Sequence, residues 1–287
     1  MAAPNLDSFA ALARASKSRA LHSQVISYCT KLAQSSKSQS EEGWAAREML
    51  IKAYLDEGQI EKAVELVKEL RNRFGSKSQR VSLLEGITLE AQGKWESAEK
   101  LYEDILNTNW NNLSVAKRLV ALKRSKGDFA AASKQLNTLL TDNQADVELW
   151  LEMCDLQMTL GAFEQALYCA EEILVSNPHS YLSNCLYADL LLTCARSSSA
   201  EPLKTKWIAD SRSYYSQSLV LRGEQGYSRA AWGLLLCVKA KKASGKEQAD
   251  ELDEKLKVKA AGILRNIYSK SPMRDMVDPV IAQLSQS

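Results

Sequence analysis

The sequence has few residues that break helices and no long apolar run. It contains 12 Gly and five Pro in 287 residues, which is few for an all-β chain with many turns. The longest uninterrupted apolar segment, residues 230–238, is about half as long as a helix that spans a bilayer. The N-terminus lacks the basic start and long apolar core of a secretory signal. These absences favour a soluble, all-α protein.

A large excess of one charge is also missing. The chain has 37 Lys and Arg against 35 Asp and Glu, whereas general nucleic-acid binding usually leaves a clear basic excess. There is no P-loop, no dinucleotide-type Gly cluster, no H-E-x-x-H and no G-x-S-x-G motif. We therefore expect a protein that is not an enzyme, with no cofactor, no nucleic-acid partner and no small-molecule substrate.

The cysteines form no C-x-x-C pair, and the two histidines, His22 and His179, lie far apart in the sequence. A nucleophile made of Cys169 or Cys185 with His179, or a zinc site that adds Cys194, is conceivable. However, the spacings match no known structural zinc site. We expect the cysteines to be small buried hydrophobic residues in a reducing compartment. They are Cys29, Cys154, Cys169, Cys185, Cys194 and Cys237.

A helical hairpin is predicted over residues 147–178. Apolar residues recur at helical spacing in each half, Gly161 separates the halves, and Pro178 ends the second helix. Its length, about 34 residues, and its residue order are those of a tetratricopeptide repeat. Glycines recur at intervals of 35, 34 and 34 residues, and each is followed five residues later by an alanine. The glycines are Gly58, Gly93, Gly127 and Gly161, and the alanines are Ala63, Ala98, Ala132 and Ala166.

The predicted fold is therefore an all-α tetratricopeptide-repeat superhelix, an α-solenoid of about five to six hairpins. The alanines would lie where two helices cross, because a larger side chain would push their axes apart. The expected array covers residues 44–242 and is divided into 44–78, 79–112, 113–146, 147–180, an irregular 181–222 and the start of a last unit, 223–242. Residues 243–287 would form a capping helix and a loose tail that contains Pro272 and Pro279.

Two segments depart from the repeat. Residues 1–43 would form an N-terminal helix and a Ser-rich connection; a mitochondrial transit peptide is the alternative, because residues 8–40 are basic and lack acidic side chains. Residues 196–206 are expected to form a loop inserted in the fifth hairpin. In a 34-residue register the small crossing residue would be residue 200, and Ser211 lies 11 residues beyond it.

The first helices of such hairpins line an inner groove, which we expect to bind protein partners. Apolar and charged groups alternate along it, as suits a polypeptide ligand. The basic segment 117–126 is either a solvated face or a patch for an acidic partner. A clamp for chaperone carboxylates is not expected, because Leu84 stands where Asn is needed. The predicted groove residues are Glu48, Lys52, Leu83, Ile87, Lys117, Arg124, Leu151, Asp155 and Met158.

With the repeats established, residues 163–182, 71–75 and 148–150 resemble the family of second subunits of the ER membrane protein complex. The likeness covers about residues 44–240. It implies a non-catalytic scaffold without a membrane span of its own, peripheral on the cytoplasmic face of the endoplasmic reticulum. The scaffold would hold cytosolic segments of membrane-embedded subunits and a soluble partner subunit, and so support insertion of transmembrane proteins.

Two other functions stay open at this stage. One is a free cytosolic adaptor or co-chaperone, which the missing carboxylate clamp disfavours. The other is a helical-repeat enzyme such as a prenyltransferase subunit, whose recurring signatures this sequence lacks.

Overall fold

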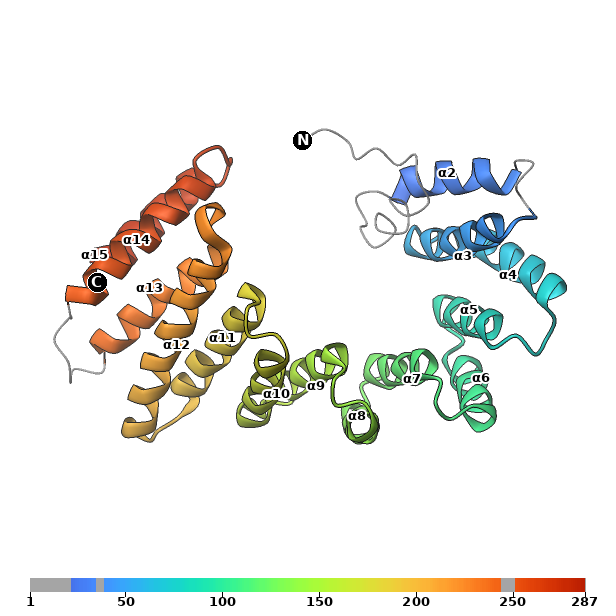
Figure 1. The fold of residues 1–287 in the computed structure, drawn as a ribbon, viewed down its shortest axis with the longest axis horizontal. Coiled ribbons are helices and arrows are strands. Elements are labelled where there is room, and N and C mark those ends of the chain that lie inside the picture. Colours follow the sequence, from blue (N-terminus) through green and yellow to red (C-terminus); the bar gives the residue numbers. More distant parts are fainter. Residues whose placement is uncertain (1–21, 35–38, 244–250, 287) are drawn as a thin grey trace. The chain divides into compact units, whose positions relative to one another are not determined.

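The computed structural model describes residues 22–34, 39–243 and 251–286, and every regular element in these ranges is a helix (Figure 1). The predicted all-α repeat fold is confirmed. The helices are α2 (His22–Gln34), α3 (Glu41–Asp56), α4 (Ile60–Phe74), α5 (Gln79–Ala91), α6 (Trp95–Thr108), α7 (Leu113–Ser125), α8 (Phe129–Asp142), α9 (Val147–Thr159), α10 (Phe163–Ser176), α11 (Tyr181–Ser197), α12 (Glu201–Arg222), the short 3₁₀ turn η2 (Gly223–Gln225), α13 (Ser228–Ala243), α14 (Glu251–Tyr268) and α15 (Arg274–Gln286).

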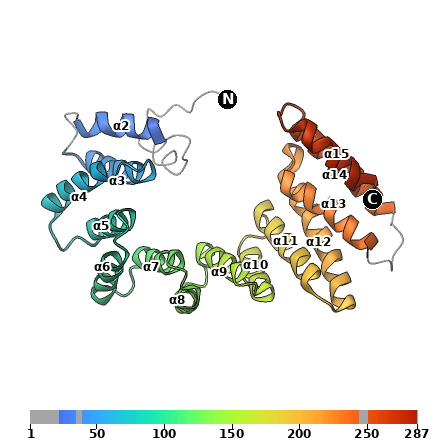
Figure 2. The same cartoon turned by 180° about the vertical axis from the view of Figure 1, so that it is seen from behind.

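The chain divides into two compact units, Met1–Asp128 and Phe129–Ser287. Within each unit, helices that follow one another pack side by side through short turns (Figures 1 and 2). In the first unit α3 packs on α4 and α5 on α6; in the second unit α9 packs on α10 and α11 on α12. First helices also touch within a unit, α3 with α5 and α11 with α13. Each unit therefore stacks hairpins through shared apolar faces, as repeat proteins do.

The repeating glycines and alanines take the places that the sequence predicts. The four glycines have φ between 73° and 80°, a conformation that costs glycine nothing and strains other residues. At Gly161 the chain leaves α9, and the amide of Ala162 donates to the Gln157 carbonyl at 2.9 Å. Ala63, Ala98, Ala132 and Ala166 are all fully buried, as expected at helix crossings.

The inserted segment is helical, so the loop predicted over residues 196–206 is wrong. α11 continues to Ser197 and α12 begins at Glu201, with Pro202 in its first turn, where proline is tolerated. Because 11 residues make about three helical turns, the longer helices keep their faces in register. Ser211 is fully buried, and its Oγ donates to the Ala188 carbonyl at 2.8 Å. It therefore takes the crossing position, as predicted.

The C-terminal segment also differs from the predicted loose tail. α15 is a helix that contains Pro279, and Val277 and Ile281 bury one of its faces in the core of the second unit. Burial at i and i+4 offsets the cost of a proline inside the helix. In α14, which is the predicted capping helix, Leu252 and Ile267 are exposed while Asp253 is buried.

A side-chain cap fixes the start of α3, the first helix of the array. α3 begins at Glu41, ahead of Trp44, because the Ser40 hydroxyl accepts the Gly43 amide at 3.2 Å and caps the helix. The transit-peptide alternative concerns residues 8–40, of which residues 8–21 and 35–38 are outside the described residues. In the part that is described, no helix is both long and apolar enough to cross a membrane.

Candidate functional site

The first unit has a pocket of about 470 Å³ beside α3 and α5. Trp44 and Phe74 form its aromatic wall, with ring centroids 5.3 Å apart at 79°. The guanidinium of Arg47 lies 4.5 Å from the centre of the Trp44 ring, a cation–π contact that fixes the indole. Leu84 completes the apolar lining. The pocket can therefore take an apolar side chain.

Charged groups border this pocket. Arg80 Nε donates to Glu48 Oε2 at 2.7 Å, and Lys52 Nζ donates to Glu48 Oε1 at 3.2 Å. The structure thus brings together two predicted groove residues, Glu48 and Lys52, and adds Arg80, which the sequence reasoning did not include. Leu83 lies instead against the core around Tyr102, while its neighbour Leu84 lines the pocket.

The basic segment of α7 is in part paired inside the first unit. Arg118 donates from Nε and Nη2 to the two oxygens of Glu90, at 2.7 and 2.9 Å. Lys126 forms an ion pair with Glu99. These pairs already balance the charges of Arg118 and Lys126 within the first unit, which argues against a patch for an acidic partner at these two residues. The predicted groove residues Lys117 and Arg124 lie on the same helix and are half-buried.

The second unit has a pocket of about 360 Å³ beside the first helices α9, α11 and α13. Its lining includes Leu151, which was predicted, and Leu182, and these side chains are 44% and 52% exposed. Tyr227 packs edge to face on Tyr181, with centroids 5.1 Å apart. Arg229 adds a cation at the rim. This apolar and cationic groove is the candidate site of the second unit.

The predicted groove residues did not include any on α11 or α13, which line this pocket. Two residues that were predicted for the groove, Asp155 and Met158, lie outside the pocket. Asp155 and Met158 are exposed further along α9, and their role stays a prediction, as does that of Ile87. Leu182, Tyr227 and Arg229 escaped because the groove positions were counted only as far as the fourth hairpin. Counting on past the 11-residue insertion would have indicated the first helices of the last two hairpins.

The cysteines are buried thiols, as predicted. Burial raises the pKa of the Cys154, Cys185 and Cys237 thiols to about 12, so they stay protonated at neutral pH. His179 lies exposed in the turn between α10 and α11, whereas Cys169 and Cys185 are buried. Among the described residues no group of three or more His, Cys, Asp or Glu is placed to hold a metal ion.

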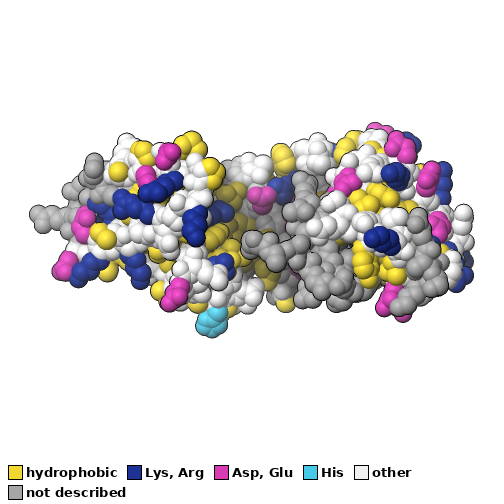
Figure 3. Space-filling model, turned by 90° about the horizontal axis from the view of Figure 1, so that it is seen from above, with side chains coloured by type: hydrophobic (Ala, Val, Ile, Leu, Met, Phe, Trp, Pro, Cys, Tyr) yellow, Lys and Arg dark blue, Asp and Glu magenta, His cyan; other side chains and the backbone are white. Residues whose placement is uncertain are grey.

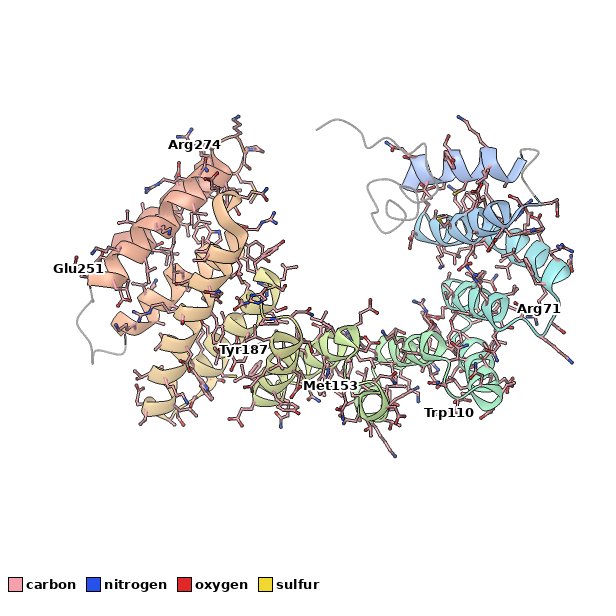
Figure 4. The ribbon with its side chains drawn as sticks, in the orientation of Figure 1. Arg71, Trp110, Met153, Tyr187, Glu251 and Arg274 are labelled. Atoms are coloured by element: carbon pink, nitrogen blue, oxygen red, sulfur yellow. The ribbon has the colours of Figure 1, made fainter. Side chains whose placement is uncertain are left out.

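The face of the molecule seen from above carries side chains of several kinds (Figure 3). In the view from above, hydrophobic side chains alternate with Lys and Arg rather than forming one broad apolar patch (Figure 3). Trp110 lies in the turn between α6 and α7, where its side chain is 76% exposed (Figure 4). Mixed surfaces of this kind suit polypeptide partners better than small molecules.

Comparison with solved structures shows the fold. The C-terminal part of a TPR repeat-containing protein from Cytophaga hutchinsonii aligns with a TM-score of 0.57 at 14% identity, covering 94% of this chain and 98% of that chain. A structure described as the functional characterization of Pseudomonas aeruginosa pilF aligns with a TM-score of 0.53 at 15% identity, covering 83% and 98%. At these identities the likeness concerns architecture alone.

Comparison of sequences is more specific. Residues 66–205 match the family described as the EMC2 TPR-like repeat domain. ER membrane protein complex subunit 2 of Xenopus tropicalis is 31% identical over 193 residues, which cover 67% of this chain and 61% of that protein. The Dictyostelium discoideum subunit 2 is 30% identical over 158 residues, covering 55% and 47%. The match thus spans less than two thirds of these relatives. The chain is a tetratricopeptide-repeat protein that resembles subunit 2 of the ER membrane protein complex.

Proposed function

We propose that this chain is a non-catalytic scaffold subunit of an ER membrane protein complex. It is peripheral on the cytoplasmic face of the membrane, where it holds cytosolic segments of membrane-embedded subunits and docks a soluble partner subunit. By holding these parts together it supports insertion of transmembrane proteins. The named relatives motivate the proposal, because each carries the subunit's name.

The observation that carries the proposal is the groove beside α9, α11 and α13. Leu151 and Leu182 leave apolar surface exposed there, and Arg229, which pairs with Asp189 but is 60% exposed, lies at its edge. An extended or helical peptide that inserts one or two apolar side chains would bury this surface, at about 25 cal/mol per Å² removed from water. The pocket beside α3 and α5 offers a second apolar anchor with its own charged border.

The test is purification of the tagged full chain from membranes solubilised in mild detergent. We expect a stoichiometric set of ER membrane proteins with the wild type, and its loss with the double variant Leu151→Glu, Leu182→Glu, because two carboxylates in an apolar groove oppose docking. The matched control is Leu160→Glu, since Leu160 is 49% exposed and lies outside the pocket lining.

Two results would contradict the proposal. Recovery of soluble chaperones alone would favour a free adaptor instead. Unchanged recovery of membrane proteins with the double variant would show that the α9–α11–α13 groove is not where they bind. Melting curves of the three proteins, followed by circular dichroism, check that each variant is folded.

A further inference from the structure

A second groove lies on another face of α9, between α8 and α10, and has a volume of about 660 Å³. Its apolar part is formed by Leu140, Met153, Trp150 and Tyr168; Met153 is labelled on α9 in Figure 4. Met153 is buried, whereas Tyr168 is 55% exposed. The groove therefore has a packed base and an open aromatic wall. It shares no lining residue with the groove used in the proposed function.

The aromatic wall is held in place from within the unit. Trp150 Nε1 donates to the Gln144 carbonyl at 2.8 Å, and its ring meets Tyr168 edge to face, with centroids 6.0 Å apart at 78°. Because the indole N–H is already bonded, the ring orientation is fixed before any ligand arrives, which lowers the entropy cost of binding.

Carboxylates complete the lining. Glu164 and Glu172 both lie on α10 at this groove, and neither forms an ion pair within the described part of the chain. The sequence between Lys134 and Arg196 contains no Lys or Arg. The same stretch carries many acidic residues: Asp142, Asp146, Glu148, Glu152, Asp155, Glu164, Glu171, Glu172 and Asp189. A cation that neutralises this groove is therefore not supplied by α9 or α10.

Two other aromatic pairs of this protein, Trp44–Phe74 and Tyr181–Tyr227, receive a cation from the chain itself. Arg47 lies 4.5 Å from the Trp44 ring centre, and Arg222 lies 4.7 Å from that of Tyr181. At Trp150 and Tyr168 no such contact occurs among the described residues. An aromatic face beside carboxylates attracts Lys and especially Arg, because ring quadrupole and ionic attraction add.

We infer that the α8–α10 groove docks a basic segment of a partner protein, in which an Arg or Lys is flanked by apolar residues. The cation would lie over the Tyr168 ring and pair with Glu164 and Glu172, while a neighbouring apolar side chain would enter toward Met153. The inference goes beyond the proposed function, because it concerns a different face and a partner of defined charge. It holds or fails whichever complex the chain joins.

The test uses the full chain and two fluorescein-labelled synthetic peptides. In the first, Leu and Arg recur at helical spacing; in the second, citrulline replaces every Arg and removes only the charge. Fluorescence anisotropy should show that the Arg peptide binds at least about tenfold more tightly than the citrulline peptide, as expected for loss of a charge-assisted pair. The difference should shrink at high salt.

Variants then locate the binding site. We expect Glu164→Gln together with Glu172→Gln to weaken the Arg peptide by about tenfold or more, and Tyr168→Leu by several-fold. Glu171→Gln is the matched control, since Glu171 is exposed on the same helix but does not line the groove. It should leave the affinity within about twofold. Circular dichroism establishes that each variant keeps the wild-type fold.

Three outcomes would overturn the inference. The wild type could fail to bind the Arg peptide, or could bind both peptides equally well. Glu171→Gln could also weaken binding as much as the double variant, which would mean that the acidic surface attracts cations without a defined site. The peptide comparison requires no variant, so it decides the matter even where a substitution affects folding.

Discussion

Two buried tyrosines, one in each compact unit, join neighbouring hairpins with the same three chemical groups but in different arrangements. In the first unit, Tyr102 on α6 lies with its Oη 2.5 Å from Glu90 Oε1. Arg118 of the next hairpin donates hydrogen bonds to both oxygens of that carboxylate. The Glu90 side chain is 9% exposed and that of Arg118 is 38% exposed, so this is a largely buried, bidentate network.

In the second unit the corresponding network is looser. Tyr215 Oη lies 2.5 Å from Asp189 Oδ1, and Arg229 Nε lies 2.5 Å from Asp189 Oδ2. The Arg229 side chain is 60% exposed, so solvent screens this pair more than the one in the first unit. The aspartate is shorter than Glu90 and receives one contact from the arginine instead of two. Both junctions between hairpins therefore combine a buried tyrosine, a carboxylate and an arginine, but the carboxylate–arginine pair is weaker in the second unit.

Each tyrosine also needs a glycine beside it. A Cβ built on Gly86 would lie 2.2 Å from a ring atom of Tyr102, and one built on Gly233 would lie 2.2 Å from a ring atom of Tyr215. In the first unit the glycine is on the preceding helix, α5, and in the second it is on the following helix, α13. The Tyr102 ring therefore packs on the preceding helix and the Tyr215 ring on the following helix. Each ring occupies the space that a glycine leaves by having no side chain.

The largest effect is expected from filling these spaces. Gly86→Ala and Gly233→Ala should each lower the free energy of unfolding by about 3 kcal/mol, because both rings are fully buried and cannot move aside. Urea unfolding followed by circular dichroism measures the loss. Gly262→Ala is the matched control: it is helical with open space around it and should gain up to about 1 kcal/mol. Equal stability of all three variants would contradict the packing argument.

The sequence allowed part of this comparison to be predicted. Three 34-residue repeats and the 11-residue insertion place Tyr215 at the same repeat position as Tyr102, and both are buried. The positions between them hold Leu136 and Ala170, also buried. Periodicity thus predicts which positions face the core, together with the turn glycines and the crossing alanines, because these follow from helix geometry alone.

The partners of the tyrosines could not be predicted in this way. Asp189 and Arg229 do not lie at the repeat positions of Glu90 and Arg118, so counting by 34 misses them. The loop expected at residues 196–206 failed for a related reason: composition suggested a loop, yet about three extra helical turns preserve all the packing faces. The α9–α11–α13 groove likewise depends on side chains from helices far apart in the sequence, and periodicity does not specify those contacts.

A smaller effect should separate the two ionic networks. Glu90→Gln should cost about 2 kcal/mol, because the buried pair with Arg118 loses its charge assistance. Asp189→Asn should cost about 1 kcal/mol, since Arg229 can turn to solvent. The unfolding free energies of both variants at neutral pH provide the measurement. If Asp189→Asn is the more damaging substitution, the ranking of the two networks is wrong.

The smallest effect is in the pH dependence of stability within the second unit, where two aspartates should behave oppositely. Burial raises the pKa of Asp189 above its ordinary value, although Tyr215 and Arg229 pull it down. Burial also acts to raise the pKa of Asp253, but hydrogen bonds from Lys241 and Arg212 hold it below the ordinary value. The ionised form thus costs stability at Asp189 and contributes stability at Asp253.

The unfolded chain loses its aspartate protons as pH rises through about 3.9. Folded Asp189 loses its proton at a higher pH than the unfolded chain does, and folded Asp253 loses its proton at a lower pH. The cost of Asp189→Asn should therefore shrink with rising pH. That of Asp253→Asn should be small in acid and reach its full size above the ordinary aspartate pKa. Urea unfolding from about pH 3 to pH 7 measures both trends, with Asp104→Asn on the exposed surface of α6 as the baseline. Parallel trends for the two variants would mean that the partners of Asp189 stabilise its ionised form as fully as those of Asp253 do. The predicted opposite pH dependence of the two aspartates would then be wrong.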